Sequence, residues 1–273
     1  MKYAISNIAW QPFEKEKIYQ LIIDKGFNGL EIAPSLFLEN NMEPYGVDFN
    51  ILRRMNNKII DKGLNIISMQ SLLYGTRGLF LFQNINTRNA LNDYMIKAID
   101  FAAILKIDNL VFGSPKNRIV PKGMSRSTAE KIAVKFFKEL GDYAHLKGTC
   151  IGVEPNAKVY GGNWLTNTLE AVELVQKVNS KGFRLNLDMG TMSLNNEKQD
   201  IIIEAFPYIN HVHISEGFLK PLPQSVDLHL KRAEIFNSLD YSGYISIEMN
   251  TINSVSNYDQ IKKALEFVRK IYK

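Results

Sequence analysis

The sequence predicts an α/β protein in which a single (β/α)8 barrel, the TIM barrel architecture, spans residues 1–273. Short apolar, β-branched runs alternate with amphipathic stretches of roughly ten to twenty residues, which is typical of a parallel sheet covered by helices. The number of runs is eight, and eight such strands close into a barrel of about 250 residues. An open doubly wound sheet is the alternative, but no glycine-rich nucleotide fingerprint follows the first run.

The predicted elements follow one another along the chain. The strands cover residues 2–10, 27–34, 64–71, 108–115, 149–155, 183–190, 210–217 and 243–250. Apolar residues recur at helical spacing in residues 14–26, 91–106, 129–148, 168–179 and 258–273. The pairs Lys25-Gly26, Lys62-Gly63 and Lys147-Gly148 predict helix ends, because glycine readily adopts the left-handed conformation that closes a helix.

The composition is that of an ordinary globular chain, with 45% hydrophobic and 22% charged residues. The one cysteine, Cys150, excludes an internal disulfide and lies in a predicted strand, where we expect it to be a core residue. The net charge of +5 comes from scattered lysines without a dense basic block, so we expect no nucleic-acid partner. Without a signal peptide or an apolar run of about 20 residues, we expect a cytoplasmic protein with no membrane partner.

Two of the four histidines, His211 and His213, lie two positions apart on one predicted strand. Side chains alternate along a strand, so both histidines face one side while Val212 and Ile214 face the other. The apolar side faces the helices, and the histidines therefore face the barrel interior. His213 is nearer the C-terminal end of the strand, where catalytic groups of such barrels gather.

The same alternation places one acidic side chain inward near the end of each of three other strands. With the histidine, the set is Glu154, Asp188, His213 and Glu248. Three confined carboxylates repel one another, and a divalent ion such as Mn²⁺, Mg²⁺, Co²⁺ or Zn²⁺ relieves that repulsion. We therefore predict that the four bind one such ion; a proton-sharing carboxylate cluster or buried ion pairs are the alternative. His211, one layer below, is predicted to hydrogen-bond in the interior instead of binding the ion.

Substrate contacts are expected from side chains near the strand ends. These candidates are Glu31, Gln70, Tyr74, Lys116, Arg118 and Asn156. Glu31 faces inward by alternation, as a substrate contact or a hydrogen-bonding neighbour of the site. Lys116 and Arg118 could receive a phosphate or carboxylate, and the apolar loop 68–82 is typical of a lid, a wall or an oligomer contact. Trp10 either stacks on a sugar or packs in the core.

These motifs resemble those of the xylose isomerase-like barrels, which include sugar phosphate isomerases and epimerases, ketose 3-epimerases, inosose dehydratase and zinc apurinic endonucleases. The resemblance rests on "GFNGLEI", "GVEPN", "NLDMGTM", "HVHISEG" and "GYISIEMN", and it covers essentially the whole chain. It implies that Glu154, Asp188, His213 and Glu248 bind the metal. In the ketose epimerases the two glutamates also move a proton next to a carbonyl, so the resemblance implies catalytic roles for Glu154 and Glu248.

Some positions depart from the family pattern. Thr191 stands where many relatives have a histidine that contacts substrate or binds zinc, and Leu219 stands where the epimerases have an arginine. We expect the adjacent Lys220 to substitute in part. The endonucleases bind three zinc ions with additional histidines. Of those positions, only that of His229, in "DLH", holds a histidine in this sequence. A DNA-repair function is therefore disfavoured.

The sequence thus predicts a metal-dependent enzyme that isomerises or epimerises a sugar or sugar phosphate through an enediolate intermediate. An inosose-type dehydratase that uses the same site and a barrel that binds sugar without turnover are the alternatives. The resemblance leaves a homodimer or a homotetramer open.

Overall fold

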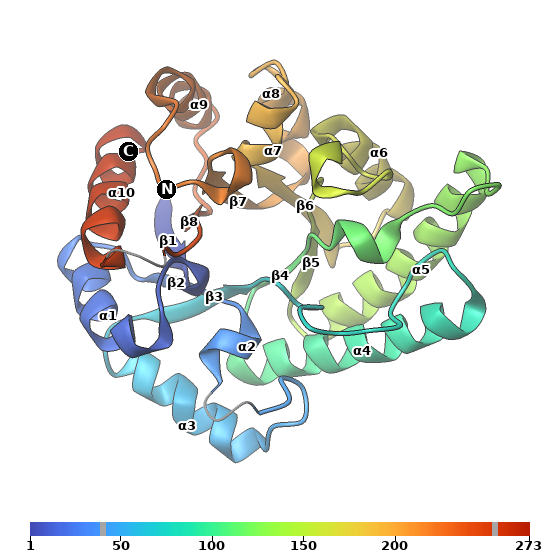
Figure 1. Cartoon of the computed structure of the whole chain (residues 1–273), viewed down its shortest axis with the longest axis horizontal. Helices are drawn as coiled ribbons and strands as arrows, with labels where there is room; N and C mark the ends of the chain where they lie inside the picture. The colour runs from blue at the N-terminus through green and yellow to red at the C-terminus, as the bar shows by residue number, and fades with distance from the viewer. Residues whose placement is uncertain (39–41, 253–255) are drawn as a thin grey trace.

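The computed structural model describes residues 1–38, 42–252 and 256–273, and its eight parallel strands close into a barrel in chain order (Figure 1). This confirms the predicted (β/α)8 fold. The strands are β1 Lys2–Ser6, β2 Gly29–Ile32, β3 Asn65–Met69, β4 Asn109–Phe112, β5 Cys150–Val153, β6 Phe183–Asp188, β7 Ile209–Ser215 and β8 Tyr244–Glu248. Each lies within one of the predicted runs or overlaps it to within a residue.

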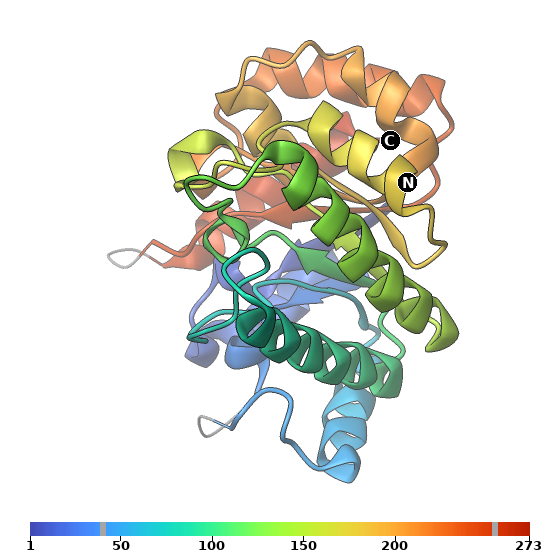
Figure 2. The ribbon, with the colours of Figure 1, turned by 90° about the vertical axis from the view of Figure 1, so that its right-hand side faces the viewer.

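The helices surround the barrel on its outside (Figures 1 and 2). They are α1 Lys15–Asp24, α2 Pro34–Phe37, α3 Phe49–Ile60, α4 Ile85–Leu105, α5 Arg126–Leu146, α6 Thr168–Val178, α7 Met189–Leu194, α8 Ile201–Ala205, α9 Val226–Ser238 and α10 Asn257–Ile271. Gly26, Gly63 and Gly148 follow α1, α3 and α5 with φ of 76°, 84° and 78°, so the Lys-Gly pairs do mark helix ends. No helix in the described ranges is long and apolar enough to cross a bilayer.

The predicted alternation on β7 is confirmed. Val212 and Ile214 are fully buried in the apolar layer under the helices, whereas His211 and His213 face the barrel interior. In the strand register, Asp188 lies beside His213, and Ser215 lies beside Glu248. The register therefore brings the ends of β6, β7 and β8 to one level, which is where the functional side chains meet.

The barrel interior is unusually polar for a fold whose interior is usually filled by branched apolar side chains. Asn210 donates to Asn109 Oδ1 at 2.8 Å, and Asn109 donates to Ser68 Oγ at 3.0 Å. Gly152 makes room for them, because a Cβ there would lie 2.6 Å from Asn109 Oδ1. Buried polar groups are tolerated when they are hydrogen-bonded, so this layer supports the site from below.

The apolar core lies between the barrel and the helices. Phe137 on α5 packs against Phe112, Phe136 and Phe183, and its ring stacks on Phe183 with centroids 4.7 Å apart. Phe183 is fully buried. The β4–β6 side of the barrel is thus joined to α5 by one aromatic cluster, which holds the strands that carry Glu154 and Asp188.

We expect Phe183→Ala to lower the free energy of unfolding by about 3–5 kcal/mol, because it removes a buried ring and leaves a cavity. Phe13→Ala is the matched control, since the Phe13 side chain is 86% exposed and its loss should change stability by less than about 0.5 kcal/mol. Urea unfolding followed by circular dichroism measures both. Equal losses in the two variants would contradict the assignment of this cluster to the core.

Candidate functional site

Four side chains predicted to bind a metal meet at the C-terminal ends of β5 to β8. They are Glu154, Asp188, His213 and Glu248, and one ligand atom from each lies within 4.8 Å of the others. Nδ1 of His213 lies 2.9 Å from Glu154 Oε1 and 3.2 Å from Glu248 Oε2. This Nδ1 is buried, and neither of these contacts has the geometry of a hydrogen bond. Three carboxylates around an unpartnered imidazole nitrogen form a donor set that fits a hard or borderline divalent ion.

The carboxylates are held by neighbouring strands. Asn186 donates to Glu154 Oε1 at 2.8 Å, and Asn156 donates to Glu154 Oε2 at 3.0 Å. Asp188 accepts hydrogen bonds from the Thr191 backbone and from the Ser215 hydroxyl. Asp188 is also the N-cap residue of α7, so helix capping as well as the strand fixes its position.

Glu31 fixes the orientation of His213. Its Oε2 lies 2.9 Å from His211 Nε2 and 3.1 Å from His213 Nε2, and all three residues are buried. A carboxylate at the far nitrogen of a metal-binding histidine sets the ring orientation and leaves the other nitrogen for the ion. Of the two roles considered for Glu31, the geometry therefore favours the hydrogen-bonding neighbour over the substrate contact. His211 lies behind His213, as the sequence predicts.

The electrostatics reflect crowding of negative charge in a buried space. Burial raises the pKa of Glu248 to about 7; His213 opposes this, while Glu154 and Asp188 add to it. Burial, together with the charge of Glu154, also raises the pKa of Asp188. Burial alone would lower the pKa of His213, but the charges of Glu31 and Glu248 raise it well above its usual value. In the protein without an ion, the cluster therefore holds protons that a divalent cation would replace.

The cluster opens into a cavity of about 640 Å³. Glu154, Asp188 and Glu248 line it, together with the predicted contacts Gln70, Tyr74, Lys116 and Asn156. Tyr74 is 77% exposed and forms part of the wall, and Gln70 donates to Ser6 on β1. Loop 68–82 thus supplies one wall of the cavity, in agreement with one of its three predicted roles.

On one side of the cavity rim, hydrogen bonds join the loops that follow β5, β7 and β8. Phe218 and Leu219, after β7, both have left-handed backbones, with φ of 62° and 52°. The Phe218 backbone donates to Tyr160 Oη at 2.9 Å, and Asn250 donates to the Leu219 carbonyl at 2.9 Å. Tyr160 and Leu219 line the cavity. Backbone strain of this kind persists where surrounding contacts hold it, and here it sets the shape of the rim.

Several predicted residues lie elsewhere. Arg118 is fully buried and does not line the cavity, so it is not placed to receive a substrate anion. Lys220 is exposed and is also absent from the lining. Trp10 is 4% exposed and packs edge-on against Tyr19, which answers the open choice for Trp10 in favour of core packing. His229 is buried between Tyr272 and Glu216, outside the cluster.

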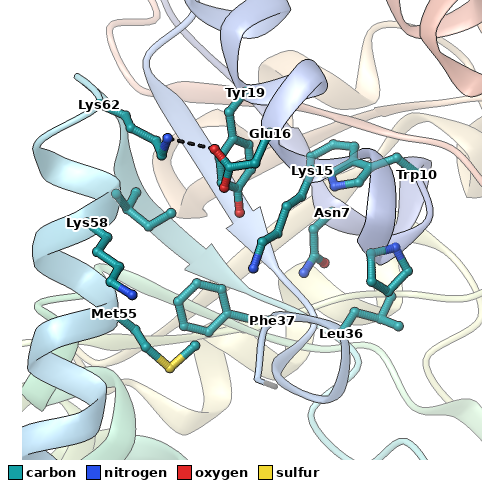
Figure 3. Close-up of a pocket in the computed structure, with 12 residues that line it drawn as sticks. Asn7, Trp10, Lys15, Glu16, Tyr19, Leu36, Phe37, Met55, Lys58 and Lys62 are labelled. Atoms are coloured by element: carbon teal, nitrogen blue, oxygen red, sulfur yellow. Dashed lines mark hydrogen bonds and ion pairs between the residues drawn. The ribbon is translucent and has the colours of Figure 1, made fainter. Parts of the chain in front are cut away.

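A smaller cavity of about 110 Å³ lies between α1, α2 and α3, and Trp10 and Tyr19 line it (Figure 3). Lys62 at its edge pairs with Glu16 at 2.7 Å. None of the four clustered side chains lines it. It is therefore separate from the barrel site.

Sequence reasoning missed four residues that shape the site: Gly113, Tyr160, Asn186 and Ser215. Alternation on β6 and β7 would have placed Asn186 and Ser215 inward, below and beside the carboxylates. Nothing in the sequence pattern distinguishes Tyr160. Gly113 is explained only by the structure, since a Cβ there would lie 2.3 Å from Glu154 Oε2.

Comparisons with known proteins agree with the barrel fold. A family model described as "xylose isomerase-like TIM barrel" matches residues 19–271. No curated protein sequence matches the chain. Among solved structures, a D-psicose 3-epimerase of Clostridium cellulolyticum H10 with D-tagatose is similar at 15% identity, TM-score 0.81, with 100% of both chains covered.

Two further solved structures are similar over nearly the whole length. A 3-keto-D-glucoside 4-epimerase of E. coli has 17% identity and a TM-score of 0.80, with 99% of both chains covered. An AP endonuclease of family 2 from Brucella melitensis has 18% identity and a TM-score of 0.70, again with 99% of both chains covered. At these identities the likeness establishes the fold.

The raised pKa of Glu248 predicts a pH dependence of stability in metal-free protein. The folded state favours the protonated carboxyl, so its contribution is full below about pH 4.5 and is lost as pH rises through about 7. We expect Glu248→Gln, which stays neutral, to lose less stability across this window than the parent, by a few kcal/mol. Urea unfolding in the presence of a chelator measures this, and parallel curves for the two proteins would refute it.

The close approach at position 113 predicts that Gly113→Ala displaces the Glu154 carboxylate. We expect roughly 10-fold or weaker Mn²⁺ binding, because second-layer changes of this kind typically cost 10- to 100-fold in metal affinity. Gly46→Ala is the control, since the nearest neighbours of its added Cβ are atoms of Glu43, none closer than 3.4 Å. Isothermal titration with Mn²⁺ compares them. Unchanged affinity in Gly113→Ala would mean that Glu154 is not a ligand.

Proposed function

The chain belongs to the xylose isomerase-like TIM barrel family, and from this premise we propose that it is a metal-dependent isomerase or epimerase of a sugar or sugar phosphate. One observation carries the proposal: three carboxylates and an imidazole converge on a single point at the mouth of the barrel and open into the 640 Å³ cavity. Cavities of about 300–1,000 Å³ are the usual size for small-molecule sites. The sugar epimerases among the similar structures support the same substrate class.

The residues present fit one divalent ion held by Glu154, Asp188, His213 Nδ1 and Glu248. Such an ion, when bound, supplies Lewis acidity toward a substrate carbonyl and hydroxyl, which makes the neighbouring carbon acidic. Glu31 holds the His213 ring by its other nitrogen, and Ser215 and the Thr191 backbone hold Asp188. The ion's identity among Mn²⁺, Mg²⁺, Co²⁺ and Zn²⁺ is not fixed by this donor set.

Glu154 and Glu248 are proposed as the proton-transfer groups. They come from β5 and β8, which are separated around the barrel by β6 and β7, so their carboxylates approach the cavity from different sides. One glutamate removes a proton from the carbon next to the carbonyl, which gives an enediolate, and a glutamate on the same or the other face returns it. Return on the same carbon from the opposite face inverts its configuration, and return on the neighbouring carbon isomerises the sugar.

The cavity walls suit a polyhydroxylated ring. Tyr74 and Tyr160 offer ring faces and hydroxyls, Gln70 and Asn156 offer amides, and Lys116 is the basic residue of the lining. Leu219 occupies the rim position at which the sequence departs from the epimerase pattern. The sugar therefore meets an apolar side chain there, and substrate handling differs from that of the epimerases which the chain resembles.

The endonuclease function receives no support from the site. At the ends of β3, β4 and β6, where the zinc endonucleases carry extra histidines, this chain has Gln70, Gly113 or Ser114, and Thr191. His229 is engaged by Tyr272 and Glu216. Within residues 1–38, 42–252 and 256–273, the other group able to hold an ion is Glu31, His211 and His213, which shares His213 with the main cluster. A sugar substrate therefore accounts for the site better than a three-zinc nuclease does.

The proposal is tested by exchange of carbon-bound hydrogen in deuterated water, followed by NMR over a panel of ketoses, aldoses, their phosphates and inososes. We expect Glu154→Gln and Glu248→Gln to slow exchange by at least about 100-fold, because general acid–base groups contribute typically 10²–10⁴-fold. Glu216→Gln is the control, a buried glutamate outside the cluster. Product analysis separates epimerisation or isomerisation from dehydration.

Full exchange in both glutamine variants would refute the two-base assignment. No exchange by the metal-loaded parent on any sugar of the panel would refute the proposed reaction for these substrate classes.

A further inference from the structure

We propose that Arg118 is a positioning residue for the candidate metal site, which sets the place of the Glu154 carboxylate from behind. This inference rests on the metal-binding role of Glu154 proposed above. Arg118 lies in a 3-10 turn, η3 Pro115–Arg118, that follows β4, and its side chain runs back under the cavity floor. It is one of the largest fully buried side chains of the protein.

The guanidinium joins the ends of β4 and β5. Its Nη1 donates to the Phe112 carbonyl at 3.2 Å, and its Nη2 donates to the Glu154 carbonyl at 2.7 Å. The Glu154 backbone in turn donates to the Phe112 carbonyl at 3.1 Å. The pairing of β4 with β5 ends at Phe112 and Val153. Arg118 thus fixes the main chain of the proposed ligand at the position where sheet hydrogen bonds end.

The same guanidinium also reaches the Glu154 side chain through one intermediate. Nη2 donates to Asn156 Oδ1 at 2.7 Å, and Asn156 Nδ2 donates to Glu154 Oε2 at 3.0 Å. Because Asn156 Oδ1 is occupied by an obligate donor, the Asn156 amide is held with its NH₂ group toward Glu154. Arg118 therefore determines which way Asn156 points, and Asn156 determines the rotation of the Glu154 carboxylate.

The buried charge of Arg118 also favours a position of the Glu154 carboxylate close to the guanidinium. Within the described part of the chain it forms no ion pair, and its acceptors are carbonyl and amide oxygens. A buried cation without a paired carboxylate is costly unless negative charge lies near, and the crowded cluster at Glu154 supplies that charge.

This arrangement replaces the expectation that Arg118 binds a substrate anion. A ligand in the cavity would have to displace Asn156 and the Glu154 main chain before it met the guanidinium. Lys116, two residues earlier on the same turn, lines the cavity instead. The two basic residues of this turn therefore have different roles: Lys116 faces the substrate cavity, and Arg118 holds the proposed metal ligand Glu154.

The test uses Arg118→Lys, which keeps the charge but lacks the planar guanidinium fork whose two terminal nitrogens reach these acceptors, and Asn156→Ala, which removes the intermediate amide. We expect each to weaken Mn²⁺ binding roughly 10- to 100-fold. We expect the double variant to bind as weakly as the weaker single variant, because the residues act in series. In the exchange assay with Arg118→Lys, whose altered side chain does not line the cavity, the maximal rate should fall by a similar factor while KM changes less than about 3-fold. Titration calorimetry on protein shown to be folded by circular dichroism gives the affinities.

Arg184→Lys is the matched control, since Arg184 also donates to a backbone carbonyl, that of Pro207, but lies at the N-terminal end of β6, opposite the cluster. It should keep the parental Mn²⁺ affinity. Parental affinity in folded Arg118→Lys, or multiplied losses in the double variant, would overturn the positioning role alone. A parent that binds no Mn²⁺ or other divalent ion would instead overturn the proposed metal site and this inference with it.

Discussion

The repulsion among three buried carboxylates around one imidazole is the constraint on which the rest of the site depends. Glu154, Asp188 and Glu248 are buried within a few ångströms of one another at the base of the cavity. Burial, with a further contribution from the neighbouring carboxylates, raises the pKa values of Asp188 and Glu248. Such a cluster does not stabilise the fold, because buried like charges oppose folding. The surrounding residues are therefore best understood as supports that hold the cluster in place for an ion.

Those supports come from both sides of the strand ends. Below the cluster, Glu31 and the asparagines of the barrel interior (Asn109, Asn186 and Asn210) stand in place of the apolar side chains that would give a stronger core. Beside it, Arg118 and Asn156 hold Glu154, and Ser215 holds Asp188. The stability lost in the polar interior is offset outside the barrel, where the β-branched residues and the Phe137 cluster bury the apolar faces of strands and helices.

The fold and the four clustered residues could be predicted from the sequence because both depend on short-range periodicity. Alternation along a strand decides whether Glu154 or His213 faces inward, and the eightfold repeat decides that the inward faces meet. Arg118 and Lys220 could not be placed in this way, since both lie in irregular turns whose paths depend on tertiary contacts. A basic residue near a strand end is compatible with facing the cavity, the core or the solvent, and Lys116, Arg118 and Lys220 show one case of each. The sequence alone indicates no role for Gly113, because its role depends on the Glu154 carboxylate beside it.

The tied rim formed by Tyr160, Phe218, Leu219 and Asn250 has a consequence for how this protein can evolve. The loops after β5, β7 and β8 share hydrogen bonds, and the two left-handed residues are held only while those bonds exist. A mutation that adapts one loop to a new substrate therefore disturbs the other two, and adaptation on this side requires coordinated changes. The loop after β3, which presents the exposed Tyr74 side chain, is hydrogen-bonded instead to the turn after β4, where Asn117 contacts Leu79 and Leu81. Natural variation in substrate range among descendants of this sequence should accumulate there first.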